Sequence, residues 1–500
     1  MRTKNPFTHT QTHVYSDSDI SLNQNKKCSK VRNVASQIIA TIACNLVKFS
    51  HGNLTALTVL LIGELSQENA EIKVTKDQLS WFGSYFFMSP VGAILFGLLS
   101  HKIGSRAMLL ITSVTYCMAG MMFHFATNST MILVPQAFVG LMIPATISSG
   151  TTYITEIAQP HLRSPLTTSG YLCMSFGTLF TMLMSQFFKT KTIAIIITVF
   201  PVIGFVGILF VPNSPFWLAR KGRFNEAEVS LAWLRGWTTL SNVRSEFLTL
   251  KEANTHEENE DIQNQKRPLR VIIKPYMEKS LWIPMSIVFC VLAMFKLTGG
   301  ESMRTYNLLI FEKYETPFDI KVASTIYDGV SIFGAIICMF SINTFGKRKL
   351  LFTSLIGGGS AYLVIALVLL LIKLEIGNSS GYLYWVPPVM LIFSSFIFSL
   401  GIDKVSYMLN SELLPTRFRE IGMGMGRFIS TLLLAMLRKV LLYMMDAMTL
   451  QGVFLFFGTI CFIALVTFYF IVPETEGKSL IEIENHFAGN QSETVKTRKL

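Results

Sequence analysis

The sequence predicts an all-α, polytopic membrane protein with twelve transmembrane helices in two six-helix repeats. Of its 500 residues, 51% are hydrophobic and only 15% are charged. That is more apolar surface than a water-soluble domain of this size buries. The apolar residues are also divided into segments of near ~20 residues, the length that crosses a bilayer as a helix. Because hydrocarbon offers backbone groups no hydrogen-bonding partner, segments of this kind must be helical and must pack together.

Twelve apolar segments flank a polar stretch, six on each side. They are predicted at residues 34–62, 79–99, 107–126, 130–154, 166–188, 192–211, 281–300, 320–342, 350–372, 383–409, 421–445 and 450–472. The chain is thereby divided into an N-terminal tail, a first six-helix bundle, a linker, a second six-helix bundle and a C-terminal tail, at residues 1–33, 34–212, 213–279, 280–472 and 473–500.

Short phrases near the ends of these segments occur once in each half. TEIAQPHLRS at 155–164 corresponds to SELLPTRFRE at 411–420, and VPNSP at 211–215 corresponds to VPETE at 472–476. Spacing agrees as well, since Glu156 and Arg163 are seven residues apart, as are Glu412 and Arg419. A duplicated half in a membrane protein is typical of secondary transporters, whose substrate path lies between the repeats.

The linker begins with a helical pattern. Ala227, Leu231 and Leu234 recur at helical spacing, with Glu226 and Glu228 on the polar side, which predicts short amphipathic helices. The highly polar run at 256–267 is interpreted as a solvated loop.

Charge is spread in a way that excludes a nucleic-acid partner. The net charge is +12, but the Lys and Arg residues lie in short loops and tails rather than on one soluble face. Among basic residues close to the spans and outside the linker, thirteen, from Lys26 to Lys478, fall on the side of the two tails and seven on the other. By the positive-inside rule both termini are expected in the cytoplasm, in a multi-pass protein of the plasma membrane. The polar first 33 residues predict no removable signal peptide.

Nothing in the sequence predicts an enzyme, a metal site or a cofactor. The seven cysteines lack the paired spacings of a disulfide or zinc framework. Lys48 and His51 in the first segment are either proton-handling groups or polar core residues, and polar packing is the favoured interpretation.

Two longer motifs carry a resemblance to a known family. Residues 213–236 read NSPFWLARKGRFNEAEVSLAWLRG, and residues 473–484 read PETEGKSLIEIE. They are similar to PxSPRWLxxxGRxxEAxxxLxxLRG and PETKGxxLxEIE of the sugar porter family in the major facilitator superfamily. The chain resembles insect facilitated trehalose transporters most, through SWFGS at 80–84. The resemblance covers roughly 34–485. It implies a carrier that moves a sugar, a hexose or a trehalose-like disaccharide, by facilitated diffusion and alternating access between the lipid-embedded halves.

The resemblance also implies a cytoplasmic gate between the two halves. Its candidate residues are Glu156, Arg163, Arg348, Glu412, Arg419 and Glu474. In each repeat an acidic residue ends one helix and a basic residue begins the next, so ion pairs there are able to lock the halves together. Interfacial charges that only set topology are the alternative. Gln136 replaces the family's fourth-helix arginine, and other gate positions differ too. A weaker gate of this kind predicts a larger inward-facing population.

The expected sugar-contact positions have changed most. The family's QQxxGxN in the seventh helix is FKLTGGE at 295–301, and other positions that contact sugar in the family are also substituted. The candidate substrate-binding residues are Tyr171, Lys296, Glu301, Tyr306, Ser331, Asp403 and Tyr407.

Charges at these positions leave three interpretations open. Charges at membrane depth are costly unless they are paired or wet. Lys296 and Glu301 either neutralise each other, as buried pairs do, or bind an organic ion, with proton coupling as a variant. A transporter-shaped sensor or scaffold that does not transport is the third interpretation.

Overall fold

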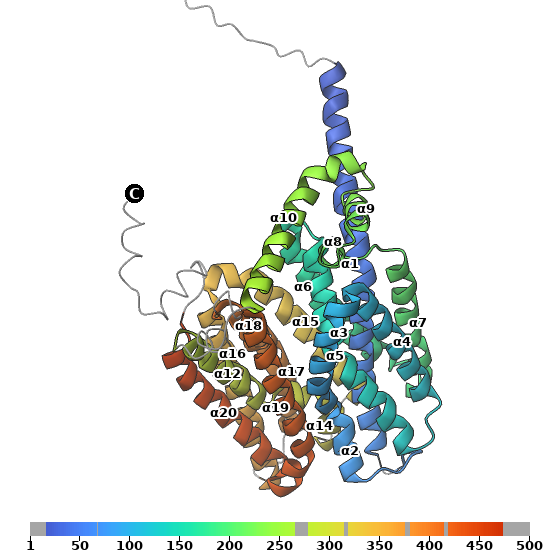
Figure 1. Cartoon of the computed structure of the whole chain (residues 1–500). Coiled ribbons are helices and arrows are strands. Elements are labelled where there is room, and N and C mark those ends of the chain that lie inside the picture. The colour runs from blue at the N-terminus through green and yellow to red at the C-terminus, as the bar shows by residue number, and fades with distance from the viewer. Residues whose placement is uncertain are drawn as a thin grey trace, which may run out of the picture.

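The computed structural model describes residues 17–67, 69–265, 279–314, 319–375, 381–414 and 419–473. These residues form helices and connecting turns, without a β-strand among them, and the helices make two adjacent bundles (Figure 1). The predicted all-α fold class is confirmed. Most of the C-terminal tail and part of the linker lie outside the described residues.

The N-terminal bundle, called the N half here, consists of seven helices and one 3₁₀ turn. These are α1 (Asp17–Leu65), α2 (Lys76–Gly83), η1 (Tyr85–Met88), α3 (Ser89–Ile103), α4 (Ser105–His124), α5 (Ser129–Ile157), α6 (Pro160–Met184) and α7 (Thr190–Leu209). In the described part of the linker, three helices follow, namely α8 (Pro215–Arg220), α9 (Phe224–Leu234) and α10 (Leu240–Gln265).

The C-terminal bundle, called the C half, repeats this plan with more interruptions. Its elements are α12 (Lys279–Leu297), α13 (Gly300–Thr305), α14 (Asn307–Lys313), α15 (Ile320–Phe345), α16 (Lys347–Lys373), η3 (Gly381–Trp385), α17 (Val386–Leu400), α18 (Ile402–Glu412), α19 (Arg419–Ala447) and α20 (Thr449–Ile471).

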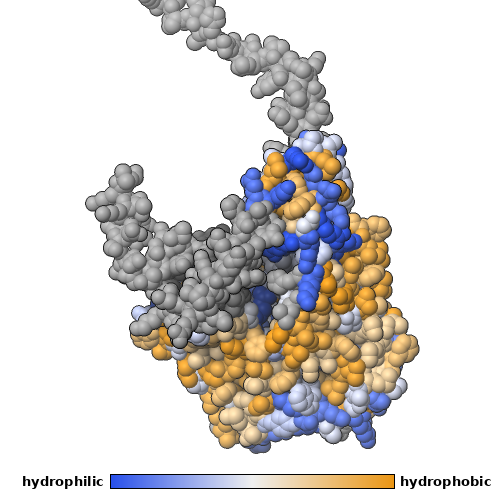
Figure 2. Space-filling model, viewed as in Figure 1, coloured by the Kyte–Doolittle hydropathy of each residue, from blue (hydrophilic) through white to orange (hydrophobic). Residues whose placement is uncertain are grey.

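All twelve predicted segments are helical. Among the described residues, ten spans are long and apolar enough to cross a membrane. The second predicted segment is broken at Ser84, so that α2 and α3 have only 8 and 15 residues. The fifth is α6, in which Arg163 and several Ser and Thr residues lower the hydropathy. Figure 2 shows the resulting belt of hydrophobic side chains, bounded by hydrophilic ones at both ends of the bundle. Such a belt is the surface that a lipid bilayer covers.

The helices depart from the predicted segments at three places. Helix α1 starts at Asp17, within the expected tail at 1–33, because polar residues alone do not stop a helix, and its membrane-spanning part begins at Val31, near the predicted start at 34. The seventh segment was expected to end at 300, but α13 and α14 continue it to Lys313. The run at 256–265 belongs to α10 and not to a loop, since its Glu, Gln and Asn residues include good helix formers.

The breaks in the C half occur at glycines with unusual backbone angles. Gly299, between α12 and α13, has φ +80°, a left-handed conformation that costs other residues energy. A Cβ there would also lie 2.6 Å from the ring of Phe457. Gly401 separates α17 from α18. At the second break the backbone N–H of Ile402 donates to Ser354 Oγ at 2.9 Å, so a side chain replaces a helical hydrogen bond there.

The linker helices pack on one end of the N half, called the linker end here. Leu218, Ala227 and Leu231 are buried together with Phe247 in a small core, which confirms the predicted apolar face of α9. Arg235 joins this unit to the bundle, because its guanidinium donates to the carbonyl oxygen of Ile157 at 3.2 Å and pairs with Glu246 at 2.6 Å.

The two halves contact each other mainly toward the end remote from the linker helices, the opposite end. The contacting helices are α1 with α14, α6 with α15, and α2, η1 and α3 with α19. Near the end of α6, Gln186 donates to Thr325 at 3.1 Å and Lys321 donates to the carbonyl oxygen of Ser185 at 3.1 Å. The halves are therefore closed against each other at the opposite end.

Within the N half, α1 packs against α6 through bare backbone. A Cβ on Gly52 would collide with the carbonyl oxygen of Met174, whereas Gly97 on α3 has open space around its Cβ position. We predict that Gly52→Ala lowers the apparent melting temperature in detergent by several degrees, because overpacking costs about 1–3 kcal/mol. Gly97→Ala is the matched control and should melt within about a degree of the parent protein. Equal melting temperatures for the two variants would contradict this close helix contact.

Candidate substrate site and gates

Lys296 is the centre of a polar cluster inside the C half. Its ammonium lies 2.5 Å from Glu301 Oε2 and donates to Tyr407 Oη at 2.7 Å. The Lys296 side chain is only 2% exposed. Lys296 lies in the last turn of α12, Glu301 in α13 and Tyr407 in α18. The break at Gly299 therefore allows Lys296 and Glu301 to pair although they are only five residues apart. Phe295 covers the cluster, with its ring edge-on to Tyr407 at 5.7 Å.

A second ion pair connects α13 with α15. Arg304 Nε is 3.1 Å from Asp328 Oδ1, and Arg304 Nη2 contacts Ser331 Oγ at 2.5 Å. Asp328 and Ser331 are both buried in α15. These two ion pairs satisfy the charges of four residues within the C half, namely Lys296, Glu301, Arg304 and Asp328. Of the open interpretations, internal pairing describes Lys296 with Glu301 and Arg304 with Asp328.

The other predicted site residues lie in three different settings. Tyr306 is buried and donates to the carbonyl oxygen of Arg438 at 3.0 Å. Its hydroxyl also contacts Gly83 of the N half, so it belongs to the contact between halves. Asp403 is partly buried beside Lys404 in α18 and makes no ion pair within the described ranges. Tyr171, on α6, is 44% exposed and its ring lies 5.9 Å from the ammonium of Lys48.

Two residues near these tyrosines were not among the predicted site residues. For Lys48 the sequence allows a proton-handling group or, as the favoured interpretation, a polar core residue; it is 5% exposed, and its amine lies over the ring of Tyr171. Arg427, on α19, lies within electrostatic range of both Lys48 and Tyr407. Their position in the middle of apolar segments is the signal that could have identified them.

The contacts given for the predicted gate residues that the structure describes lie within one half. Glu412 pairs with Lys347 at 3.0 Å, and Arg348 donates to the carbonyl oxygen of Tyr469 at 2.6 Å, both within the C half. Glu156 is hydrogen-bonded to Ser214 at the linker end of the N half. Arg163 is exposed at the same end. Two further gate candidates are not placed, because the side chain of Arg419 and all of Glu474 lie outside the described residues.

A set of contacts that the sequence did not predict closes the two halves together at the opposite end, between α2 and α19. Lys439 on α19 donates to Asp77 Oδ1 on α2 at 2.5 Å, and Tyr443 Oη donates to the same oxygen at 3.0 Å. Lys76 forms a second ion pair, with Asp446. These five residues are called the α2–α19 latch. Lys439 also lies over the ring of Trp81, 4.1 Å from its centroid. The hydrogen bond from Lys439 holds the pKa of Asp77 below its ordinary value of 3.8.

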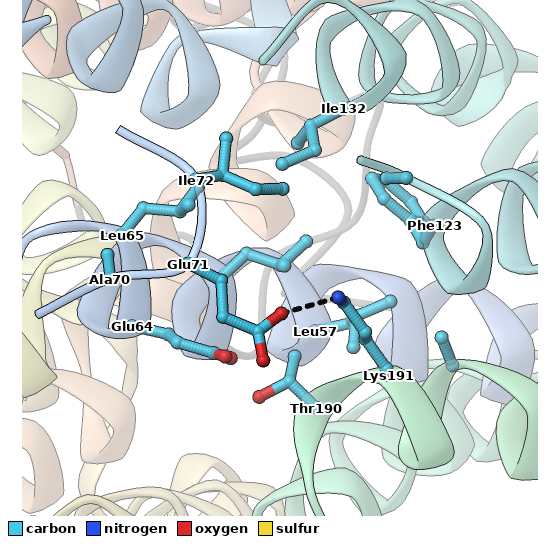
Figure 3. A pocket seen from close by; sticks show the side chains of 13 residues that line it. Leu57, Glu64, Leu65, Ala70, Glu71, Ile72, Phe123, Ile132, Thr190 and Lys191 are labelled. Atoms are coloured by element: carbon cyan, nitrogen blue, oxygen red, sulfur yellow. Dashed lines mark hydrogen bonds and ion pairs between the residues drawn. The ribbon is translucent and has the colours of Figure 1, made fainter. Parts of the chain in front are cut away.

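A small pocket at the opposite end lies within the N half rather than between the halves (Figure 3). Its wall is largely apolar, with Leu57, Ile72 and Phe123 among the lining residues. Lys191 bridges to Glu71 at 2.6 Å across its mouth, and this hydrogen bond lowers the pKa of Glu71. Since α1, α4 and α7 belong to one bundle, the pocket is not on a path between the repeats.

Lys296 and Glu301 should stabilise the protein through their mutual attraction, so that losing one of them costs more than losing both. Glu301→Gln leaves the buried ammonium without its counter-ion, and breaking a buried pair costs about 3–5 kcal/mol. We predict a clear drop in apparent melting temperature for Glu301→Gln, partly reversed in the double variant Lys296→Gln/Glu301→Gln. If the two substitutions add instead, the residues are not coupled.

The α2–α19 latch should set the share of molecules that are closed at the opposite end. Asp77→Lys places like charges together, and Asp77→Lys/Lys439→Asp restores the attraction in reverse. Spin labels on Thr127 and Thr449, which are exposed at the opposite end, should report longer distances for the single variant and recovery in the double variant. Exposed ion pairs are individually weak, about 0–1 kcal/mol, so we expect a roughly twofold to fivefold change in population.

Acidification gives an independent check on the latch. Because pairing lowers the pKa of Asp77, the latch stabilises the closed state fully above the ordinary pKa of 3.8. This stabilisation is lost as the pH falls through the lowered pKa, so the label distances should lengthen on acidification. Glu71→Gln is the control, since it removes an ion pair that stays within the N half. Label distances that respond equally to Glu71→Gln and Asp77→Lys would contradict a role for the latch.

Comparison with known proteins agrees with this architecture. The profile of the sugar (and other) transporter family matches residues 36–487. The chain is 27% identical to the facilitated trehalose transporter Tret1 of Polypedilum vanderplanki, over 91% of this chain and 89% of that protein. It is 24% identical to Tret1 of Apis mellifera ligustica, over 91% and 88% of the two chains.

Solved structures show the same fold. A partially occluded, inward-open conformation of the xylose transporter XylE from E. coli superposes with a TM-score of 0.70, covering 89% of this chain and 100% of that chain at 14% identity. An inward-open conformation of XylE gives a TM-score of 0.69. Because the family profile spans most of the sequence, the protein belongs to the sugar (and other) transporter family and is a multi-pass membrane protein of the major facilitator fold.

Proposed function

We propose that the protein is a plasma-membrane carrier of sugars that works by alternating access, with both termini in the cytoplasm. The observation that carries this proposal is a polar, internally neutral cluster, Lys296–Glu301–Tyr407, in the middle of an otherwise apolar bundle. Relatives named as trehalose transporters and a fold shared with a xylose transporter support the sugar class.

The Lys296–Glu301–Tyr407 cluster offers both hydrogen-bond donors and acceptors to the hydroxyl groups of a sugar. A neutral ion pair presents donors and acceptors without a net charge, as the amides of other sugar porters do. Tyr407 is 38% exposed although it lies in the middle of a span, and Tyr171 in the N half is exposed as well. Exposed aromatic rings give the apolar C–H face of a sugar ring a flat surface to cover. We therefore assign Tyr171 and Tyr407 to the two sides of the substrate site.

Alternating access follows from the two ends of the bundle. In this state the α2–α19 latch joins the halves at the opposite end, which the proposed topology places outside the cell. The linker end then faces the cytoplasm, with Lys347–Glu412 and Glu156–Ser214 each confined to one half. In the reverse state we expect the latch to break and the acidic and basic groups at the linker end, with Arg163, Arg348, Arg419 and Glu474, to join the halves.

Facilitated diffusion is the proposed mode. His51 is buried and lies 3.2 Å from the hydroxyl of Tyr116, which itself contacts Thr146 at 2.6 Å. A histidine held in a hydrogen-bonded chain of this kind fits a packing role in the N half. It does not supply the exposed titrating group that a proton-coupled carrier requires.

Tracer uptake into proteoliposomes tests the proposal. We expect saturable uptake of at least one sugar from a panel of glucose, xylose, trehalose and glucuronate, with a rate that an imposed pH gradient does not change. Empty liposomes and an excess of unlabelled sugar are the controls. An absence of flux for every sugar would favour a sensor or scaffold, and uptake only in the presence of a proton gradient would replace facilitated diffusion with symport.

A further inference from the structure

The first spans of the two halves carry the same pattern around a lysine. Lys48 is followed four residues later by Gly52, and Lys296 is followed four residues later by Gly300. At the fifth position the repeats differ. The C half has Glu301, which pairs with Lys296 at 2.5 Å, whereas the N half has Asn53, an amide whose oxygen accepts from Thr181 at 3.2 Å. Lys48 therefore lacks the counter-ion that its twin possesses.

No other described residue supplies that counter-ion. The Lys48 side chain contacts the ring of Tyr171 and the bare backbone at Gly170, where a Cβ would lie 2.5 Å from its ammonium. Among the described residues it has no carboxylate partner. An isolated ammonium at this depth costs several kcal/mol, so it calls for an anion that is absent from the chain itself.

A second unpartnered group lies beside it. Asn45 is 6% exposed, and its Nδ2 donates to Ser169 at 2.8 Å. Its Oδ1 has no hydrogen-bond partner among the described residues, and it would lie 3.1 Å from a Cβ on Gly170, next to the Lys48 ammonium. A cation and a free amide acceptor side by side are complementary to a carboxylate and a hydroxyl on neighbouring carbons.

The C half adds a second cation rather than a counter-charge. Arg427 on α19 lies within electrostatic range of Lys48 and of Tyr407. Its guanidinium has no ion pair within the described part of the chain. Two acidic residues of the C half are engaged elsewhere, Glu301 with Lys296 and Asp328 with Arg304. Asp403 makes no ion pair among the described residues, but the charge of its neighbour Lys404 offsets its own. Lys48 and Arg427 are both left without a carboxylate partner in the described part of the chain.

We infer that Lys48 and Arg427, one from each half, form an anion subsite for the carboxylate of a sugar acid. This inference rests on the proposed carrier function and names its substrate class. The sugar ring lies between Tyr171 and Tyr407, Asn45 accepts from a ring hydroxyl, and the carboxylate bridges the two cations. Arginine and carboxylate form charge-assisted hydrogen bonds, which are about twice as strong as neutral ones. Binding the anion also draws the two halves toward each other.

Glucuronate and glucose provide the matched probes, because they share a ring and differ in a carboxylate at C6. In proteoliposomes of the full-length protein, glucuronate should half-saturate exchange at a concentration at least about tenfold lower than glucose. Lys48→Gln and Arg427→Gln should each reduce this preference about tenfold, and Lys48→Arg should retain most of it. Lys102→Gln, which removes an exposed cation at the end of α3, controls for net charge and should keep the full preference.

Thermal unfolding separates this inference from the carrier proposal. Glucuronate should raise the melting temperature of the parent protein more than glucose does. The increase that glucuronate causes should be smaller in Lys48→Gln than in the parent protein. The unliganded Lys48→Gln protein should itself melt higher, since an uncompensated charge is removed. If the protein transports sugars without any preference for glucuronate, the anion subsite is wrong and the carrier function stands. If glucuronate raises the melting temperature but no sugar is transported, the carrier function is wrong and the anion subsite stands. If neither transport nor stabilisation is seen, both proposals are wrong. If Lys48→Gln does not fold, Arg427→Gln carries the comparison.

Discussion

An ionised group in hydrocarbon must find an opposite charge or water, and this constraint organises the whole molecule. It gives the outer surface its apolar belt and sends charged residues to the two ends of the bundle or into its centre. In the centre of the C half it is met by Lys296 with Glu301 and by Arg304 with Asp328. In the N half it is not met by the chain itself at Lys48. The proposed chemistry of the carrier follows from that difference.

The two repeats share a scaffold but not a site. Both begin with a span that carries a lysine and a glycine four residues later, and both place an exposed tyrosine nearby. In the C half the fifth position is a carboxylate, and a broken helix lets it reach the lysine. In the N half the same position is an amide in an intact helix. Corresponding positions therefore hold a neutral ion pair in the C half and, in the proposed anion subsite, an unpaired cation in the N half.

The sequence predicted the architecture well, because hydrophobic segments of spanning length are a direct consequence of bilayer thickness. It predicted the positions of helix breaks poorly. The turn at Gly299 depends on a tertiary contact with Phe457, and the polar run at 256–265 has both loop-like polarity and good helix formers. The spacing of Lys296 and Glu301 in the sequence predicts that they lie near each other. The same spacing is compatible with an internal ion pair and with binding of a charged ligand, so the sequence did not distinguish the two.

The α2–α19 latch shows the limit of this kind of prediction most clearly. Asp77 and Lys439 are 362 residues apart in the chain, and each alone has the sequence signature of an ordinary interfacial charge. The gate candidates that the sequence predicts lie where phrases repeat, at the linker end. Repetition detects what the halves have in common, whereas the latch joins helices that are not equivalent in the two repeats. Only the three-dimensional arrangement of α2 and α19 brings its members together.

The contrast between α1 and its twin also distributes stiffness unevenly. Helix α1 runs without interruption over 49 residues, whereas the equivalent span of the C half is divided into α12, α13 and α14. Bending an intact helix strains every hydrogen bond along the bend, but a helix already broken at Gly299 and Tyr306 can pivot with few bonds lost. Of the two first spans, the one in the C half is therefore the easier to bend. A change of state that alters the shape of a first span should alter that of the C half before that of α1.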